Sequence, residues 1–507
     1  MKNTRRETIG GRYVHIPVKG IGEAAASLWF LPWMNGAAAR FNYVPATSAD
    51  CDFVAAIDLG ENFGGELRVE SDSGLLCRSF SFAATPPETG AKNEPLRQQF
   101  HFSPFRGWLN DPNGLGFFGG KYQMFYQYNP FGVTWSNMHW GRAESDDLVH
   151  WRETGVFLRP EAFGAPYSGG VVIDHRNDSG LGDGKEPPVL MYFTAAGDHV
   201  EPKQPYTQRL LYSTDGGATF RDYDRNPVIG SLVDDGERDP SIVWDETGGI
   251  WRMGLYCGDK DREFRFFKSS NLIDWRETGR FRDDIGRECP ELFTLRDEKD
   301  GKAYMVLLTA TGHYWVGTFI DDRFVPGPRQ LLAARFGNFY AAQTFKNTGD
   351  RRILLGWQPC EVRDRRFSQS MTLPLELTLK DGVIKVAPVR EIESRRGAEF
   401  DVLPLAEGQC WELEIVSLDS GAALLDVCGE KVLLDVDAGE IRVGVAKLDG
   451  LARPLRCRIF ADRQTIEVFA DGKYLSKQKS AAADGVRPAE CWSPDCRLAR
   501  LRAWEIK

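Results

Sequence analysis

The stretch DLVHWRETGVF (residues 147–157) returns almost unchanged as NLIDWRETGRF (residues 271–281), and a looser relative, STDGGATFRDY (residues 213–223), lies between them. Self-similarity of this kind indicates one supersecondary unit that is built several times along the chain. A common surface strand that recurs by coincidence is the alternative, and a near match over such a length disfavours it. The repeat therefore predicts the blades of a β-propeller, in which each sheet buries its faces against neighbouring sheets.

Short apolar runs surround these copies, among them KYQMFYQYNP (121–130), PPVLMYFTAAGD (187–198) and GIWRMGLYCGDKD (249–261). They are rich in β-branched and aromatic residues and are bounded by Gly, Asp, Asn and Pro, which is typical of strands joined by tight turns. Helical periodicity is scarce. We expect an all-β chain whose central part, residues 96–390, is a five-bladed β-propeller.

Two regions flank this propeller. Residues 12–82 have the pattern of short strands, and the polar stretch ATPPETGAKNEPLRQQ (84–99) is typical of a linker. After Pro388, runs such as CWELEIVSL (410–418) and EIRVGVAKL (440–448) alternate apolar and polar residues. We therefore predict a small N-terminal β domain with its linker over residues 1–95 and a C-terminal β-sandwich over residues 391–507.

The charge balance narrows the choice of partners. The chain has 507 residues and a net charge of -9, with no block of Lys and Arg that could follow a phosphate backbone. Nucleic acid and membranes are therefore not expected, and a neutral small molecule or polymer fits better. No signal-peptide pattern opens the sequence, which predicts a cytoplasmic protein as written, or a secreted one if a signal was removed.

The cysteines and histidines give no sign of a metal or a cofactor. None of the ten cysteines forms a C-x-x-C pair, and the seven histidines are scattered. We expect mostly reduced, buried thiols, with a Cys491–Cys496 disulfide as the less favoured alternative. We predict no metal site and no cofactor, and the sequence leaves the oligomeric state open.

Three acidic residues occur in unusual company. Asp111 lies in NDPNG (110–114), Asp239 in GERDPSIVW (236–244) and Glu288 in IGRECPELF (285–293). Each has a simple alternative explanation: a tight turn for NDPNG, pairing with Arg238 for Asp239, and a solvated turn for Glu288. However, all three precede apolar strands, and a propeller gathers such positions around its central channel. We expect the three carboxylates to converge.

Converging carboxylates can break a glycosidic bond. This chemistry needs one carboxylate to attack or shield the anomeric carbon and one protonated acid to supply the leaving oxygen. The acid must keep its proton near neutrality, which an apolar or anionic neighbourhood achieves.

Nine motifs together resemble glycoside hydrolase family 32, which contains invertases, levanases and exo-inulinases. In chain order they are WLNDPNG, FYQYNP, WSNMHWG, YSGGVVID, RDP, ECPELF, FYAAQTF, RILLGW and RIFADRQTIEVF. The resemblance runs from about residue 101 to the C-terminus. It implies a five-bladed propeller followed by a β-sandwich, and an exo-acting β-fructofuranosidase that acts with retention through a covalent fructosyl-enzyme. The implied substrates are sucrose, fructo-oligosaccharides or fructans, a class of neutral oligo- and polysaccharides.

The resemblance also implies residue roles. Asp111 matches the nucleophile, Glu288 the general acid/base and Asp239 the transition-state stabiliser. Seven positions match the terminal-fructose pocket: Asn110, Gln127, Trp135, Ser168, Arg238, Cys289 and Trp357. For the two tryptophans a plain core role stays open, and for Cys289 an inert buried thiol stays open.

The chain also departs from the commonest family forms. Arg287, Tyr167, Glu237 and Leu375 differ from the usual residues, which puts the acceptor side of the pocket in doubt. The N-terminal domain could bind polymer, complete the pocket rim or serve packing alone. A fructosyltransferase that uses the same site is one alternative function, and a non-catalytic fructan-binding propeller, disfavoured by the presence of all three acids, is another.

Overall fold

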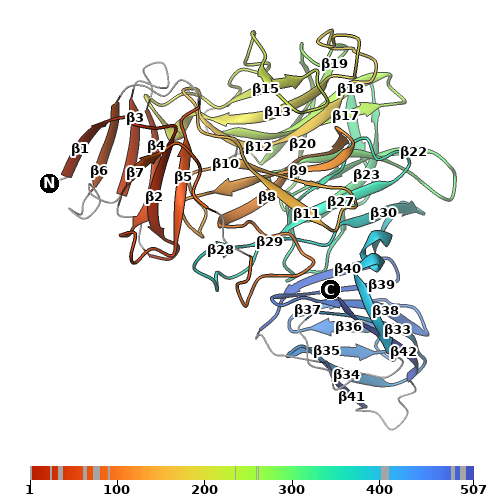
Figure 1. Ribbon diagram of the computed structural model, residues 1–507. Helices are drawn as coiled ribbons and strands as arrows, with labels where there is room; N and C mark the ends of the chain where they lie inside the picture. The colour runs from red at the N-terminus through yellow and green to blue at the C-terminus, as the bar shows by residue number, and fades with distance from the viewer. Residues whose placement is uncertain are drawn as a thin grey trace.

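The computed structural model describes residues 3–22, 26–31, 38–60, 66–71, 80–88, 92–233, 236–258, 260, 262–400, 410–480, 486–491 and 498–506. Regular structure in these residues is nearly all β, with short 3-10 helices at Gly197–His199 and Arg390–Arg395. Figure 1 shows an N-terminal sheet in red, a central body that runs from orange to cyan, and a C-terminal body in blue. The predicted all-β fold is confirmed.

The N-terminal sheet has the strand order β1-β6-β3-β4-β2-β5, with β7 beside β2. Its strands are β1 (Asn3–Thr8), β2 (Tyr13–Lys19), β3 (Ala26–Leu31), β4 (Ala38–Pro45), β5 (Phe53–Asp58), β6 (Glu66–Ser71) and β7 (Ser81–Ala83). Strand β5 alternates buried and half-buried residues, as expected when one sheet face covers a core. That core includes Phe131 and Val200 of the central body, and β14 (Val200–Glu201) pairs with β4. The N-terminal sheet is therefore docked on the central body.

The central body consists of five sheets in the described part of residues 107–388. Sheet 1 contains β8 (Gly107–Phe118), β9 (Lys121–Asn129), β10 (His139–Ser145), β11 (Trp151–Leu158) and the short parallel β28 (Phe367–Ser368). Sheet 2 contains β12 (Ala165–Ile173), β13 (Val189–Ala196), β15 (Thr207–Ser213) and β16 (Arg221–Asp222). Sheet 3 contains β17 (Glu237–Asp245), β18 (Ile250–Cys257), β19 (Glu263–Ser269) and β20 (Arg276–Arg282).

Sheet 4 contains β21 (Glu291–Arg296), β22 (Ala303–Leu308), β23 (His313–Ile320), β24 (Arg323–Pro326) and β25 (Gln330–Leu331). Sheet 5 contains β26 (Tyr340–Thr344), β27 (Arg352–Gln358), β29 (Ser370–Met371), β30 (Leu375–Lys380) and β31 (Val383–Pro388). The first strands contact one another in the order β8, β12, β17, β21, β26, and β26 returns to β8. This closed ring makes each sheet one blade of a propeller.

The sequence repeat has a structural cause. Its copies cover the turn into the outermost strands β11, β16 and β20 of blades 1, 2 and 3. Asp147 Oδ1 accepts the backbone N–H groups of the residues two and three positions on, and Asn271 Oδ1 does the same. Leu148 and Leu272, one position on, both have positive φ, at 69° and 61°. The repeat therefore preserves a side-chain-bonded turn that directs the outer strand along the blade.

The C-terminal body is a pair of facing sheets. One has the order β32 (Arg396–Phe400), β42 (Leu498–Ile506), β33 (Trp411–Leu418), β38 (Leu455–Ala461), β39 (Thr465–Ala470) and β40 (Lys473–Gln478). The other has the order β37 (Ala446–Leu448), β36 (Glu440–Val443), β35 (Glu430–Asp435), β34 (Ala422–Val427) and β41 (Val486–Cys491). Apolar residues of both sheets share one core, which is the arrangement of a β-sandwich.

The end of the stretch that resembled a linker is packed against this sandwich. Glu94, Arg97 and Gln98 are buried, and Glu94 and Arg97 form an ion pair of 2.7 Å. Gln98 donates to Thr465, and the Gln99 backbone N–H donates to Asp462. Residues 94–99 therefore fasten the sandwich to the start of blade 1.

Five of the cysteines in the described residues are buried free thiols, namely Cys257, Cys289, Cys410, Cys428 and Cys457, while Cys51 and Cys360 are free and half-buried. The Cys491–Cys496 pair considered above falls outside the described residues, since Cys496 is not described. No group of His, Cys, Asp and Glu in the described part of the chain could hold a metal ion. A search of the same residues finds no helix of the length and hydropathy needed to cross a membrane.

Candidate active site

The three acidic residues come from three different blades. Asp111 lies on β8 of blade 1 and Asp239 on β17 of blade 3, both of which belong to the inner ring of strands. Glu288 lies just before β21 of blade 4, which is also in that ring. The propeller therefore brings together side chains that are up to 177 positions apart in the sequence, counted from Asp111 to Glu288.

The NDPNG pentapeptide is part of a strand, so the tight turn that its composition favours does not form. It lies inside β8 and pairs with β9, but the register shifts between Leu109 and Pro112 and again between Asn113 and Gly116. Gly114 has φ 54°, and a Cβ there would lie 2.7 Å from Met191 Sδ of blade 2. Residues suited to a turn thus produce bulges, which redirect side chains at the rim of a sheet.

The other two acids also lie on irregular backbone. Asp239 has φ 66° at a register shift in the β17–β18 pairing. Glu288 and Cys289 have φ 30° and φ 42° in the turn that enters β21. Non-glycine residues in this region of backbone conformation are uncommon and cluster at functional sites, where the surrounding fold holds them.

Cys289 links two of the carboxylates. Its backbone N–H donates to Asp239 Oδ2 at 3.1 Å, and its Sγ lies 3.4 Å from Asp111 Oδ2 and 3.6 Å from Asp239 Oδ2. Burial, with the nearby carboxylates, raises the pKa of this thiol well above its usual value. Because the thiol stays protonated, Cys289 is a hydrogen-bond donor between the carboxylates and is neither a nucleophile nor an inert core residue.

Arg238 and Tyr340 hold the third carboxylate. Arg238 donates to Glu288 Oε2 through Nε at 3.2 Å and through a terminal nitrogen at 2.9 Å. The Tyr340 hydroxyl donates to Glu288 Oε1 at 2.8 Å. Arg238 also lies 3.8 Å from Asp239, so the pairing expected for Asp239 is shared between two acids. Both oxygens of Glu288 are thereby oriented.

The two aspartates have raised pKa values. Burial is the main cause of the raised pKa of Asp111, and the hydrogen bond from Ser168, at 2.7 Å, opposes it. Burial also raises the pKa of Asp239 to about 7; Arg238 opposes this shift, whereas Glu288 and Asp111 reinforce it. Crowding of carboxylates that raises their pKa values is the pattern expected where protons are moved.

The predicted sugar-binding residues lie around the three carboxylates, and all of them except the exposed Trp135 are buried or half-buried. Asn110 accepts from Trp108 and donates to Asp111, and Gln127 donates to the Pro166 carbonyl while its own buried carbonyl oxygen has no partner among the described residues. Such an orphaned acceptor is ready for a ligand hydroxyl. Ser168, Arg238 and Cys289 contact the carboxylates as described above.

The two tryptophans differ. Trp357 is half-buried, packs edge-on against Trp108 and Tyr340, and donates to Gln369. Trp135 is 51% exposed and makes edge contacts with Tyr167 and His199, so the plain core role left open for it is wrong. Trp135 therefore lies at the surface against Tyr167, and the next residue on that strand, Ser168, bonds to Asp111.

Two residues that contact the acids, Tyr340 and Thr194, were not predicted from the sequence. Tyr340 lies in the motif FYAAQTF, which is a signal in the sequence, but the motif alone does not indicate that its hydroxyl bonds to Glu288. The Thr194 hydroxyl accepts the Asp239 backbone N–H at 3.0 Å, and nothing in its surroundings, a buried strand, marks it. Both position a carboxylate.

The four departures from the family pattern lie in different places. Leu375 is fully buried in the large propeller core, so it does not form the acceptor side of a pocket. Glu237 is buried and accepts the Leu232 backbone N–H at 2.6 Å. Arg287 is exposed, and the Tyr167 hydroxyl bonds to His199 at 2.7 Å. Only Arg287 and Tyr167 remain as candidates for contact with a leaving group.

The inner strands of the propeller bring three carboxylates together, with an orphaned acceptor and aromatic rings nearby. This arrangement is typical of a glycosidase active site. The comparisons with known proteins agree. The model of the glycosyl hydrolases family 32 N-terminal domain matches residues 101–388. The chain belongs to this family.

Individual relatives extend the match. The chain is 31% identical to a levanase of Bacillus subtilis (strain 168) over 471 residues, which cover 79% of this chain and 68% of the levanase. It is 34% identical to an extracellular exo-inulinase of Aspergillus awamori, over 57% of this chain and 63% of that protein. The chain thus spans about two thirds of the length of these relatives.

The fold has a solved counterpart. The crystal structure of the exo-inulinase from Aspergillus awamori superimposes with a TM-score of 0.71 and 23% identity, covering 82% of this chain and 99% of that one. At this level of identity the match supports the fold.

Proposed function

We propose that this chain is a retaining, exo-acting β-fructofuranosidase that releases terminal fructose from sucrose, fructo-oligosaccharides or fructans. The observation that carries the proposal is the meeting of Asp111, Asp239 and Glu288 around Cys289 and Arg238. Proteins named levanase, extracellular exo-inulinase and invertase are similar to this chain, which supports the proposal.

In the first step we assign Asp111 as nucleophile and Glu288 as acid. An Asp111 oxygen forms a bond to the anomeric carbon of fructose, the bond from that carbon to the leaving oxygen breaks, and Glu288 gives its proton to the leaving oxygen. Ser168 and Asn110, which bond to the two Asp111 oxygens, fix the direction of attack. Tyr340 and Arg238 fix the carboxyl group of Glu288.

In the second step Glu288 acts as base. It takes a proton from water, the water oxygen attacks the anomeric carbon, and the bond to Asp111 breaks, which restores both carboxyl groups. Asp239 forms no covalent bond to the sugar. It accepts hydrogen bonds from the ring hydroxyls while positive charge develops on the sugar. The orphaned Gln127 carbonyl is a further acceptor for a hydroxyl.

A substrate panel tests the proposal. Purified chain is incubated with sucrose, 1-kestose, inulin and levan, and the products are separated by chromatography over time. Free fructose that appears from the start, without intermediate oligomers, supports exo-acting hydrolysis. Oligomers longer than the substrate at high sucrose would identify a fructosyltransferase. If no substrate gave any product, the hypothesis of a non-catalytic fructan-binding propeller would be favoured.

The stereochemistry is tested separately. Proton NMR within the first minutes of sucrose cleavage should show β-fructofuranose before mutarotation, because two displacements at one carbon restore its configuration. Initial appearance of the α anomer would contradict the covalent intermediate and leave the hydrolase assignment intact.

A further inference from the structure

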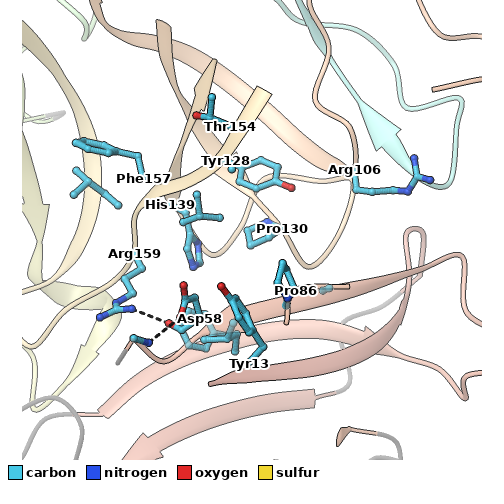
Figure 2. A pocket seen from close by; sticks show the side chains of 18 of the residues that line it. Tyr13, Asp58, Pro86, Arg106, Tyr128, Pro130, His139, Thr154, Phe157 and Arg159 are labelled. Carbon is cyan, nitrogen blue, oxygen red and sulfur yellow. Dashed lines mark hydrogen bonds between the residues drawn. The ribbon is translucent and has the colours of Figure 1, made fainter. Parts of the chain in front are cut away.

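A cavity of about 780 Å³ lies between the N-terminal sheet and blade 1. Strands β2 and β5 supply one wall, and β9, β10 and β11 supply the other (Figure 2). Small-molecule sites in proteins typically have volumes of about 300–1,000 Å³. The cavity reaches the outermost strand of the blade, whereas Asp111 lies on the innermost strand, so the two sites are distinct.

Two polar side chains on the blade 1 wall each carry one atom, the Tyr128 hydroxyl and the His139 Nε2, without a hydrogen-bond partner among the described residues. Tyr128 and His139 are directly opposite in the β9–β10 pairing and are 8% and 3% exposed. No hydrogen bond joins the Tyr128 hydroxyl to any residue that the structure describes. Figure 2 shows the His139 ring directed toward Asp58 and Tyr13, and the Tyr128 hydroxyl on the side of Arg106.

The tautomer of His139 follows from its contacts. Its Nδ1 lies 2.5 Å from the Asn137 carbonyl oxygen, so Nδ1 carries the hydrogen. Burial lowers the pKa of His139 to about 4, which leaves the ring neutral. Nε2 is therefore a bare acceptor, and on the paired strand the Tyr128 hydroxyl can donate or accept. Within the cavity both atoms are available to bond to water or to the hydroxyl groups of a polar ligand.

The charges around the cavity are already paired. Arg12 makes two bonds of 2.9 Å to Asp58, Arg106 bonds to Glu94, and Arg159 bonds to Glu161. Asp222 is paired with Arg209, and Glu153 lies 3.7 Å from Lys92. An ionic ligand would meet groups of both signs, each with its own counter-ion. A neutral ligand is favoured.

The rest of the lining suits the faces of a sugar. Tyr13 lies on β2 beside Pro86, and the opposite wall carries Pro130 and Phe157 (Figure 2). Aromatic and proline surfaces pack against the C–H faces of a sugar ring, while its hydroxyls need fixed donors and acceptors such as Tyr128 and His139. A purely apolar ligand would leave those two groups unsatisfied.

We propose that this cavity is a second, non-catalytic binding site for a short neutral oligosaccharide of fructose. The chemistry of the wall indicates a neutral sugar, and its identity as a fructoside rests on the proposed function. Gln127, which bonds to the Pro166 carbonyl of blade 2 and is a predicted residue of the fructose pocket, and Tyr128, which lines the cavity, are neighbours on β9 and point to opposite faces of the strand. The site is therefore placed to hold substrate chains close to the catalytic centre.

The test uses the full chain with Asp111→Asn, which prevents turnover. Calorimetric titrations with nystose and with a levan tetrasaccharide cover the two linkage types, and maltotetraose tests for any neutral sugar. Adding Tyr13→Ala should remove one binding event for the preferred fructoside. The matched control Tyr212→Ala, a half-buried tyrosine on β15 of blade 2, should leave the titration unchanged. An identical titration with and without Tyr13→Ala would overturn the proposal.

Tyr128→Phe is the second variant, because it removes one hydroxyl and keeps the packing. The affinity of the cavity should fall about three- to tenfold, the loss expected for one hydrogen bond. In a chain with an intact Asp111, Tyr13→Ala should leave sucrose hydrolysis unchanged and slow the release of fructose from long fructan. If the unaltered chain does not cleave sucrose, the proposed function fails while the titrations still report on the cavity. Equal affinity in the unaltered and Tyr128→Phe chains would contradict the assignment of this wall.

Discussion

Two groups of buried carboxylates in this molecule have opposite surroundings. Asp462, at the junction of propeller and sandwich, accepts the backbone N–H groups of Gln99 and Phe100 and bonds to the His101 ring at 2.9 Å. Burial alone would raise its pKa, but the hydrogen bonds from His101 and the backbone lower it to about 2. At the candidate active site, burial outweighs the available donors and raises the pKa of Asp239 to about 7.

The difference in pKa distinguishes a carboxylate that stabilises the fold from carboxylates that are available for catalysis. A carboxylate whose acceptor positions are filled by its own chain stabilises the fold and has no capacity left for a ligand. Asp111 and Asp239 share the single thiol hydrogen of Cys289 and crowd each other, so they keep acceptor capacity for a substrate at a cost in stability. The following substitutions test this division.

The largest effect is expected for Asp111→Asn. An amide keeps the shape of the side chain but cannot form the bond to the anomeric carbon, so the kcat for sucrose should fall on the order of 10⁴-fold or more. The measurement is the initial rate of fructose release, and circular dichroism checks the fold. Asp224→Asn, an exposed aspartate of blade 2, is the matched control and should keep full activity. A residual rate within tenfold, roughly, of the unaltered chain would exclude Asp111 as nucleophile.

A smaller loss is expected for Glu288→Gln, and it should depend on the leaving group. Proton transfer contributes roughly 10²- to 10⁴-fold, and this contribution is needed for sucrose but hardly for an aryl fructoside with an acidic phenol. The ratio of kcat/KM for the two substrates is therefore the readout. A loss of the same size on both would show that Glu288 does not supply the proton.

Much of this site is predictable because its residues stand in short motifs. The three acids are members of these motifs, and so are Arg238 and Cys289. The structure adds that both of these neighbours act across blades, since Arg238 bonds to Glu288 and Cys289 bonds to Asp239. The fold class follows from the repeat, whose turns are held by bonds within a few residues. NDPNG was taken for a turn since its composition favours one, and the pairing of β8 with β9 overrides that preference.

The remaining features depend on tertiary contacts. Thr194 is an ordinary residue of a buried strand and reaches Asp239 only because blades 2 and 3 pack together. The second cavity needs Tyr13 and His139, far apart in the sequence, to face each other across two sheets. The polar stretch 94–99 becomes a packed segment only through Asp462 and Thr465 of the sandwich. No pattern within one segment contains this information.

The third prediction concerns the junction. Asp462→Asn removes the carboxylate that bonds to the buried His101, leaves only Glu467 at 3.5 Å, and should lower the free energy of unfolding by about 3 kcal/mol, measured by chemical denaturation. Burial lowers the pKa of His101, but Asp462 and the nearby Glu467 raise it overall to about 9. The stabilisation by His101 should thus be complete below its unfolded pKa and be lost as the pH rises through about 9. The exposed Asp437→Asn is the control, and an equal loss there would contradict the prediction.

The smallest effect has the opposite sign and completes the comparison. Asp239 has a raised pKa, so ionisation of its buried carboxyl group opposes folding once the pH passes the unfolded value, and the cost is complete above about 7. Asp239→Asn removes that charge and should raise Tm by a few degrees at pH 8, with the gain shrinking to nothing in acid, while activity is lost. Thermal melts at several pH values, with Asp224→Asn as control, measure the difference. The same change at Asp462 should destabilise the fold. A loss of stability at both positions would contradict the comparison. It would mean that neighbouring donors already fill the acceptor positions of Asp239, with no capacity left for a sugar hydroxyl.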